Sequence, residues 1–204
     1  MFCLRISSKD NSALQDCLNI TPCLTGSNTE YQRFLEQAFG VSERLKKMGA
    51  VRYIGASFHD RDLARQWLDS PLLDVVMVRH NIAHRAAQKK VFSHLNAEDP
   101  ARSGIITFKS AGMQTALWKA PGSLPQKCWQ PSVPDLYRYS LSQNCVDVCL
   151  TALTNRQEID AAVTGVRQGK LTPAEIEYLN VYGDLHRDRL KIEDVDRNLL
   201  IYRD

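Results

Sequence analysis

The sequence has no apolar run long enough to cross a membrane. Its longest runs, such as the one within Leu72–Val78, are far shorter than the ~20 residues that a spanning helix needs. The N-terminal residues also lack the long apolar stretch after a basic start that marks a secretory signal. We therefore expect a globular protein of the cytoplasm with no membrane partner.

The sequence also has no strong excess of charge of either sign. Its 26 basic and 23 acidic residues leave a net charge of +3 at pH 7. This excess is too small, and too scattered, to indicate a surface for nucleic acid. We expect no nucleic-acid partner.

None of the six cysteines forms a CxxC pair. An even number is compatible with disulfides, but without a secretory signal the reduced and mostly buried state is favoured. Cys145 and Cys149 lie four residues apart in a predicted strand, where side chains alternate between faces. We therefore expect both to point to the same face and to pack in the core.

The sequence does contain a regular alternation of strand-like and helix-like segments. Largely apolar strand-like runs are expected at 51–56, 73–78, 104–108 and 146–150. Helical stretches are expected after them, at 60–68, 84–95, 133–141 and 155–166. Strands that are apolar on both faces and alternate with amphipathic helices predict parallel β/α units.

Two further helices flank this alternation. One is predicted over Tyr31–Met48, with Gly49 as its C-terminal stop. The other follows a capping box, with Thr172 as N-cap and Glu175 at N3, and should run to about residue 190. The first residues are ambiguous: MFCLRI is compatible with one more strand, and residues 11–26 with a loop or a short helix.

The order and spacing of these segments resemble the aldo-keto reductase family over roughly residues 43–188. The matching segments are LKKMGAVRYIGAS, DVVMVRHNIAHR, GIITFKSAG, DLYRYSLSQNCVDVCLTALTNRQEIDAAV and LTPAEIEYLNVYGDLH. They resemble that family's fifth to eighth strand units and its closing helix. The resemblance implies a partial (β/α)8 TIM barrel, with about four to five parallel βα units plus a C-terminal helix.

This resemblance also suggests a division of the chain. Residues 1–30 are a poorly defined N-terminal segment that includes one possible strand. Residues 31–190 form an aldo-keto reductase-like half-barrel, and residues 191–204 form a C-terminal tail.

The family reduces small-molecule carbonyls with NADP(H), so the resemblance implies a set of cofactor-binding residues. Ser57 matches the serine that hydrogen-bonds the nicotinamide carboxamide, and Phe108 matches the aromatic residue that stacks on the nicotinamide ring. Ser110 falls near the pyrophosphate. The residues that match the region for the adenosine and its 2′-phosphate are Asn155, Arg156 and Glu158. Among them Arg156 is the expected phosphate partner.

At four positions the chain departs from the family pattern. Phe58 and Met77 replace an Asn and a Gln that bind the carboxamide. Ala152 replaces a Gly, and Ala162 replaces the Asn that contacts adenine. We therefore expect NADP(H) binding to be weak or lost.

We assign no catalytic residues. The family's catalytic Asp, Tyr and Lys lie in the first half of its barrel, which has no counterpart in this sequence, and the His follows the fourth strand. If Met1–Ser7 is that strand, Arg5 lies near the expected place. We expect a protein that is inactive or incomplete as this chain alone: part of a longer protein, a self-associating half-barrel, or a relic that folds poorly.

An alternative of another class is a non-catalytic module, derived from such a reductase, that binds nucleotides or other proteins. Open sheet edges would favour such association.

Several other residues allow two interpretations. His80 and His84 have a spacing that can bind a metal on a helix, but no HExxH pattern supports a site. Trp118 and Trp129 either line a pocket or tether a loop. Four arginines could face a phosphate, although ion pairs or solvation are favoured: Arg52, Arg61, Arg79 and Arg85.

Overall fold

The computed structural model describes residues 4–5, 17–20, 28–112 and 116–202. These residues belong to two compact units. The first contains residues up to Val78 together with Lys90–Ile106, and the second contains Arg79–Lys89 together with the residues from Thr107 onward.

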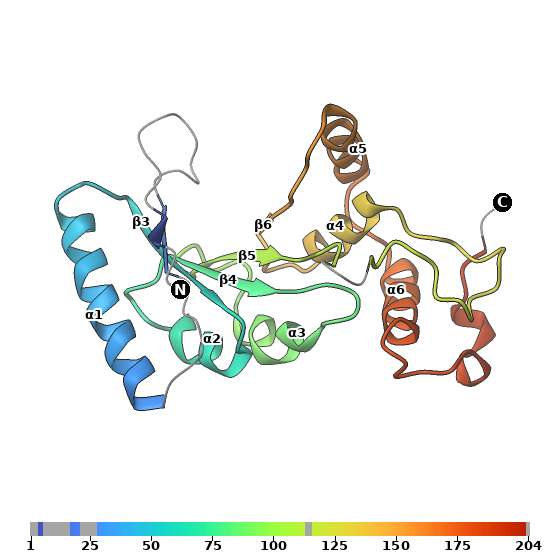
Figure 1. The fold of residues 1–204 in the computed structure, drawn as a ribbon, viewed down its shortest axis with the longest axis horizontal. Coiled ribbons are helices and arrows are strands. Elements are labelled where there is room, and N and C mark those ends of the chain that lie inside the picture. Colours follow the sequence, from blue (N-terminus) through green and yellow to red (C-terminus); the bar gives the residue numbers. More distant parts are fainter. Residues whose placement is uncertain (1–3, 6–16, 21–27, 113–115, 203–204) are drawn as a thin grey trace. The chain divides into compact units, whose positions relative to one another are not determined.

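The first unit is built on a sheet whose strands follow one another in chain order (Figure 1). The strands are β1 (Leu4–Arg5), β2 (Cys17–Ile20), β3 (Tyr53–Phe58), β4 (Val75–Arg79) and β5 (Gly104–Phe108). The strands β2, β3 and β4 are parallel, with Ile20 opposite Ala56 and Ser57 opposite Met77. The β1 strand is antiparallel to β2. The last residues of β4 and β5 belong to the second unit.

Burial explains why β3 forms a central strand. Every residue from Ile54 to Phe58 is buried, as expected for a parallel strand that is covered on both faces. At its first residues the backbone N–H of Ile54 donates to the carboxylate of Asp74, which also binds Lys46 at 2.6 Å.

Two helices pack in the first unit, and both have clear end signals. Helix α1 (Asn28–Lys47) ends before Gly49, whose φ of +71° suits a residue without Cβ. Helix α2 (Arg61–Leu68) begins after Asp60, whose carboxylate accepts hydrogen bonds from the first backbone N–H groups of the helix. The Phe39 and Trp67 rings, one from each helix, lie 4.5 Å apart between centroids.

The second unit is mainly helical. Its elements are α3 (Ala86–Lys90, whose last residue falls in the first unit), α4 (Val133–Leu141), β6 (Val148–Cys149), α5 (Arg156–Arg167) and α6 (Pro173–Leu185). Short 3-10 turns complete the chain at Phe92–His94 in the first unit and at Ile192–Asp194 and Arg197–Leu199 in the second.

One hydrophobic core holds the second unit together. Residues of α4 and α6 pack around Tyr139, Tyr178 and Tyr182, which are fully buried. Trp129 stacks on Tyr178 with the ring centroids 5.5 Å apart, and the Tyr178 hydroxyl donates a hydrogen bond to the backbone carbonyl of Trp129. The loop after β4 joins this core through Ile82.

Helix α6 lies directly against the loop after β4 (Figure 1). A Cβ on Gly183 would stand only 2.2 Å from the carbonyl oxygen of Ile82. Only glycine permits this approach. The close contact therefore fixes the position of α6 on the loop.

The predicted alternation of strands and helices is confirmed, as are the parallel strands of the sheet. The capping box of Thr172 and Glu175 is present, but α6 ends at Leu185 rather than near residue 190. A turn follows it, in which Asp188 has a φ of +51° that a helix cannot accommodate. The helix expected over 84–95 is replaced by a five-residue helix and a 3-10 turn.

Two expectations for the N-terminal residues were wrong. Residues 17–20, expected in a loop or short helix, form the strand that pairs with β3 in parallel. Leu4–Arg5 is a strand as expected, but it is antiparallel to β2 and so is not the barrel strand before β3. Arg5 therefore does not mark the place expected for the catalytic His. Because β2 is the parallel neighbour that precedes β3, the position expected for the His would follow β2. The residues directly after β2 lie outside the described residues. The division at residues 30 and 190 stays a prediction.

None of the helices in the part of the chain that the structure describes is both long enough and apolar enough to span a membrane.

The Gly183 contact gives a first prediction. Replacing Gly183 with Ala should lower the free energy of unfolding by ~1–3 kcal/mol, because helix and loop must separate to admit the methyl group. Gly40, exposed in α1 with open space around it, is the matched control, and G40A should stabilise by ~0.5–1 kcal/mol. Urea unfolding followed by circular dichroism measures both. Equal effects of the two substitutions would contradict the packing argument.

Candidate functional site

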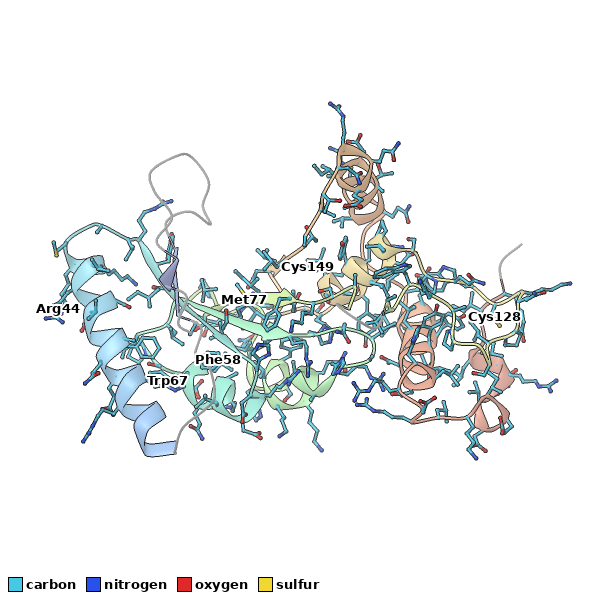
Figure 2. The ribbon with its side chains drawn as sticks, in the orientation of Figure 1. Arg44, Phe58, Trp67, Met77, Cys128 and Cys149 are labelled. Atoms are coloured by element: carbon cyan, nitrogen blue, oxygen red, sulfur yellow. The ribbon has the colours of Figure 1, made fainter. Side chains whose placement is uncertain are left out.

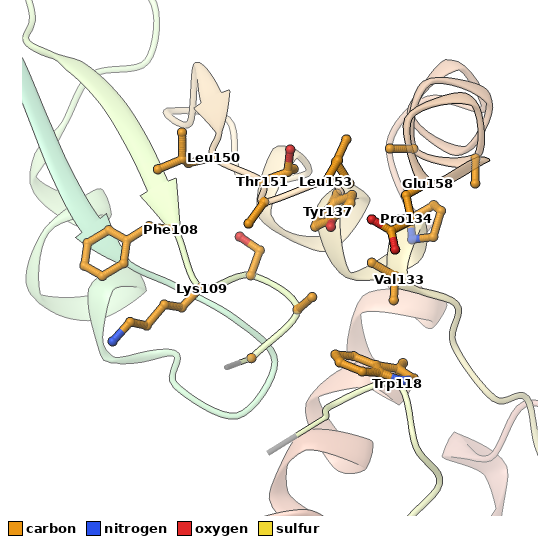
Figure 3. Close-up of a pocket in the computed structure, with 16 residues that line it drawn as sticks. Phe108, Lys109, Trp118, Val133, Pro134, Tyr137, Leu150, Thr151, Leu153 and Glu158 are labelled. Atoms are coloured by element: carbon orange, nitrogen blue, oxygen red, sulfur yellow. The ribbon is translucent and has the colours of Figure 1, made fainter. Parts of the chain in front are cut away.

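The second unit contains a cavity of about 540 Å³ at the carboxyl ends of β5 and β6 (Figure 3). We call it the β5–β6 pocket. Its walls come from the residues after each strand, 108–112 and 150–153, and from the facing sides of α4 and α5. The backbone N–H of Leu150 donates to the carbonyl of Thr107 at 2.7 Å and so joins the two strand ends. Barrel proteins place their functional sites at this end of their strands.

Most of the pocket lining is apolar. Its apolar residues include Trp118, Val133, Pro134, Leu150, Leu153 and Ala162. A Cβ on Gly165 would lie 2.3 Å from the Cβ of Pro134, so glycine allows α5 to approach α4 at this wall. Such a lining can hold a flat ring or an aliphatic body, with a few polar groups to orient it.

Phe108 ends β5 and is one of the residues that line the pocket, and its stacking on a nicotinamide stays a prediction (Figure 3). Lys109 follows it with a φ of 58°, in the left-handed region that side chains other than glycine rarely adopt. This turn sends the Lys109 ammonium to 6.0 Å from the centre of the Phe108 ring. In Figure 3 the Phe108 ring and the Lys109 side chain both extend away from the labelled residues of α4 and α5, so the ammonium lies beside the ring and not against the helix wall of the pocket.

Ser110 is buried and its hydroxyl oxygen is held from two sides. The Ser140 hydroxyl donates to it at 3.1 Å, and the thiol of Cys149, which ends β6 and is labelled in Figure 2, donates to it at 3.1 Å. Burial raises the pKa of Cys149, and its hydrogen bonds offset this only in part. Cys149 is therefore a neutral thiol that positions Ser110, and not an activated nucleophile.

Glu158 lies in the first turn of α5 and lines the pocket. Its carboxylate accepts the backbone N–H of Thr154 at 2.7 Å and the Thr154 hydroxyl at 3.0 Å. These bonds, the N–H first, hold the pKa of Glu158 below its usual value. The pocket therefore carries an ionised carboxylate at neutral pH.

Asn155 and Arg156 lie at the same helix start but do not line the pocket. The Asn155 side chain caps α5 by accepting the backbone N–H of Glu158 at 2.9 Å. The Arg156 side chain is 91% exposed and pairs only loosely with Asp160, at 3.5 Å. Arg156 is thus available to a ligand near the helix start.

Ser57 belongs to the first unit, so the structure brings together only part of the predicted site. Its hydroxyl donates to the sulfur of Met77 at 3.3 Å, and Phe58 is buried (Figure 2). The second unit brings Phe108, Ser110 and Glu158 to one pocket.

The lining residues that the sequence analysis missed include two with a polar or charged end group, Lys109 and Tyr137. No pattern marks either of them, because a lysine after a strand is usually solvated and a tyrosine in a helix usually packs in the core. The two tryptophans have different roles: Trp118 lines the pocket, whereas Trp129 is buried in the hydrophobic core. Ala152 and Ala162, two of the four departures from the family pattern, are also part of the lining.

His80 and His84 do not share a metal site in the described part of the chain. His80 stacks on Tyr139 at 5.4 Å, and His84 Nε2 lies 2.7 Å from Arg187. Among the described residues, no three His, Cys, Asp or Glu side chains are grouped to share a metal ion.

A second cavity, of about 780 Å³, lies in the first unit at the amino ends of its strands. It is lined by Tyr53 and Val75, which begin β3 and β4, and by Ser103 before β5. In barrel proteins this end serves stability rather than function. The β5–β6 pocket is therefore the candidate site.

Comparison with known proteins supports the resemblance to aldo-keto reductases through structure alone. No family model matches the sequence, and no curated protein matches it. The structure is similar to that of aldo-keto reductase AKR11C1 from Bacillus halodurans in its holo form, with a TM-score of 0.58 and 16% identity over 90% of this chain and 63% of that chain. The apo form of the same protein gives a TM-score of 0.56 at 15% identity, over 90% and 64% of the two chains.

A third similar structure is PA4992 from Pseudomonas aeruginosa, a protein assigned to the aldo-keto reductases. It gives a TM-score of 0.54 at 17% identity, over 74% of this chain and 50% of that chain. This chain thus spans less than two thirds of the length of each of these proteins. At such identities the likeness concerns the fold: an α/β protein with parallel strands that matches part of the (β/α)8 barrel, as predicted.

The Glu158 cap gives a second prediction. A carbon-detected NMR titration should place the pKa of Glu158 below that of an unfolded glutamate, and T154V should raise it because the hydroxyl donor is lost. Because the folded-state pKa is depressed, the cap stabilises the protein above the unfolded-state pKa. This stability is lost as pH falls through the folded-state pKa. An unshifted pKa in the unaltered protein would refute the bonding.

Proposed function

We propose that this chain supplies the cofactor-binding part of an aldo-keto reductase-like oxidoreductase, which reduces small carbonyl compounds with NADP(H). The observation that carries the proposal is the convergence of Phe108, Ser110 and Glu158 on one pocket at the carboxyl ends of β5 and β6. A location in the cytoplasm is part of the proposal.

The chemistry of the lining supports a dinucleotide. The Phe108 ring offers a face on which a nicotinamide can stack. The cofactor supplies the hydride, and the residues of this chain bind and orient it. The apolar wall formed by Pro134, Leu153 and Ala162 suits a flat adenine ring, although Ala162 offers it no hydrogen bond.

The start of α5 supports recognition of a phosphate. A helix N-terminus carries a partial positive charge and attracts anions. Arg156 adds a guanidinium there, exposed and only weakly paired. Glu158 is already bonded to Thr154, so its charge is partly neutralised by donors of the chain itself.

Binding should nevertheless be weak. Met77 replaces a carboxamide partner and instead accepts the Ser57 hydroxyl. Each polar contact missing from a buried site costs ~1–3 kcal/mol. Two or three such losses weaken binding by roughly a hundredfold or more, at about 1.4 kcal/mol per tenfold.

A second candidate function, an interaction module, is favoured by the outer face of α5. Ile159, Val163 and Val166 lie at helical spacing on this face and are 47%, 44% and 38% exposed. Three β-branched residues in one stripe are unusual on a solvated helix. A concentration-dependent dimer in sedimentation, abolished by V163D, would favour this function.

Cofactor binding is the third prediction. Millimolar NADPH should raise the thermal midpoint of the purified chain, because a ligand of the folded state stabilises it. R156Q should weaken NADPH binding by roughly ten- to hundredfold, since a charge-assisted bond is worth ~1.5–3 kcal/mol. R156Q should leave the binding of NADH unchanged, because NADH lacks the 2′-phosphate.

Arg167 at the other end of α5 provides the matched control. It is exposed and carries the same charge, so R167Q should leave NADPH binding unchanged. A cooperative melt that NADPH does not shift would contradict the cofactor proposal.

The fourth prediction concerns turnover. Among the described residues, Tyr137 is the only tyrosine that lines the pocket. Burial first, and then electrostatic interactions with Cys149 and Glu158, raise its pKa. A tyrosine that donates a proton in carbonyl reduction needs a lowered pKa instead. The purified chain should therefore show no measurable oxidation of NADPH with a simple aldehyde. Turnover above the rate without protein would contradict this expectation.

A further inference from the structure

Four arginines gather in the second unit, outside the β5–β6 pocket. Arg79 ends β4 and Arg85 ends the loop that follows it, whereas Arg187 and Arg189 lie in the turn after α6. The loop and α6 lie side by side (Figure 1). We call these four residues the arginine cluster.

Two members of the cluster are fixed by bonds to the protein. Arg85 forms an ion pair with Asp184 at 2.6 Å and donates to the carbonyl of Ile82 at 2.6 Å. Arg189 donates to the carbonyl of Ala83 at 3.2 Å and lies 3.7 Å from Asp184. The single carboxylate of Asp184 therefore serves two guanidinium groups.

Arg187 is held in a different way, by an imidazole. Its Nη1 lies 2.7 Å from Nε2 of His84. Because a guanidinium only donates, Nε2 must be the acceptor. The other ring nitrogen, Nδ1, lies 3.2 Å from Oδ1 of Asn81, and because an amide oxygen can only accept, Nδ1 must be the donor in that contact. Both contacts require His84 to be neutral, with its proton on Nδ1.

Arg187 therefore has a directed contact but no counter-charge. Among the described residues, it forms no ion pair with a carboxylate. Burial, and after it the charge of Arg187, lower the pKa of Arg79. Arg85 and Arg189 thus share the carboxylate of Asp184, and Arg187 adds a further positive charge to the same turn, an arrangement that an anion would stabilise.

We propose that the arginine cluster binds the phosphate group of a small phosphorylated ligand, with Arg187 as the principal contact. The planar guanidinium matches phosphate oxygens in a bidentate manner. Arg79 ends a parallel strand, and this is the strand end at which barrel proteins place their functional sites. The net charge of the whole chain, +3, is too small for a polynucleotide surface. The site does not depend on the proposed reductase function.

The test uses inorganic pyrophosphate as the probe, measured by isothermal titration calorimetry at constant ionic strength. The unaltered protein should bind it at one site, and R187Q should weaken binding by about tenfold or more, the loss of one charge-assisted bond. R187K, which keeps the charge but loses the planar fork, should lie between them. Circular dichroism verifies that each variant folds.

Two further variants locate the site. R197Q makes the same charge change at an exposed residue of the second unit and should bind pyrophosphate like the unaltered protein. R156Q removes the guanidinium that the cofactor proposal assigns to phosphate at the start of α5, so it separates pyrophosphate bound there from pyrophosphate bound at the arginine cluster. A loss in R156Q rather than R187Q would move the phosphate to the β5–β6 pocket and overturn the proposal.

The remaining outcomes also decide the question. No binding by the unaltered protein, or equal losses in R187Q and R197Q, would overturn the site. Equally strong binding of succinate would overturn its assignment to phosphate. Because NADPH is not the probe, failure here leaves the cofactor proposal untouched, and failure of NADPH binding leaves this one untouched.

Discussion

The side chain of Asn81 connects the two strand ends on which both candidate sites depend. Its Oδ1 accepts the backbone N–H groups of Ala83 and His84, at 3.0 and 2.8 Å, and so shapes the loop after β4. Its Nδ2 donates to the carbonyl of Lys109 at 2.8 Å, directly after β5. Only an amide offers acceptor and donor in this arrangement. The β5–β6 pocket begins at the second of these ends, and the arginine cluster surrounds the first.

The polar groups of the two sites differ in how far the chain itself satisfies them. In the pocket, Ser110 and Glu158 already accept hydrogen bonds from Cys149 and Thr154. A ligand in the pocket must therefore use the remaining hydrogen-bonding capacity and apolar contacts. The hydrogen bonds that order Ser110 and Glu158 are thus also the reason why binding should be weak. In the arginine cluster, Arg187 contacts the imidazole of His84 and forms no ion pair with a carboxylate among the described residues. An anion would add the charge pairing that the described residues do not give Arg187.

Sequence patterns predicted the strands and helices well where local signals are strong. The helix predicted over 60–68 and the apolar run of β5 each gave an element close to its observed bounds, and the Thr172 box gave the start of α6 but not its end. Sequence patterns failed at β2 because its four residues, Cys17–Ile20, have no turn or cap signal. Their strand is defined by its pairing with β3. Long-range contacts of this kind leave no mark in a local window.

The candidate site was predictable only through the resemblance to the aldo-keto reductase family. Phe108, Ser110 and Glu158 were named in this way, and all three line one pocket, whereas Asn155 caps α5 beside it. Lys109 enters the pocket because its backbone adopts a positive φ, which its residue type does not suggest. Arg187 becomes important through His84, 103 residues away along the chain.

Hydrogen–deuterium exchange with and without NADPH tests the central claim most directly, since it reports where the cofactor lies and not only whether it binds. If the β5–β6 pocket holds the dinucleotide, amides of residues 108–112 and 151–158 should exchange more slowly with NADPH, while those of α6 keep their rates. Unchanged exchange in both segments, or protection confined to other parts of the chain, would contradict the account.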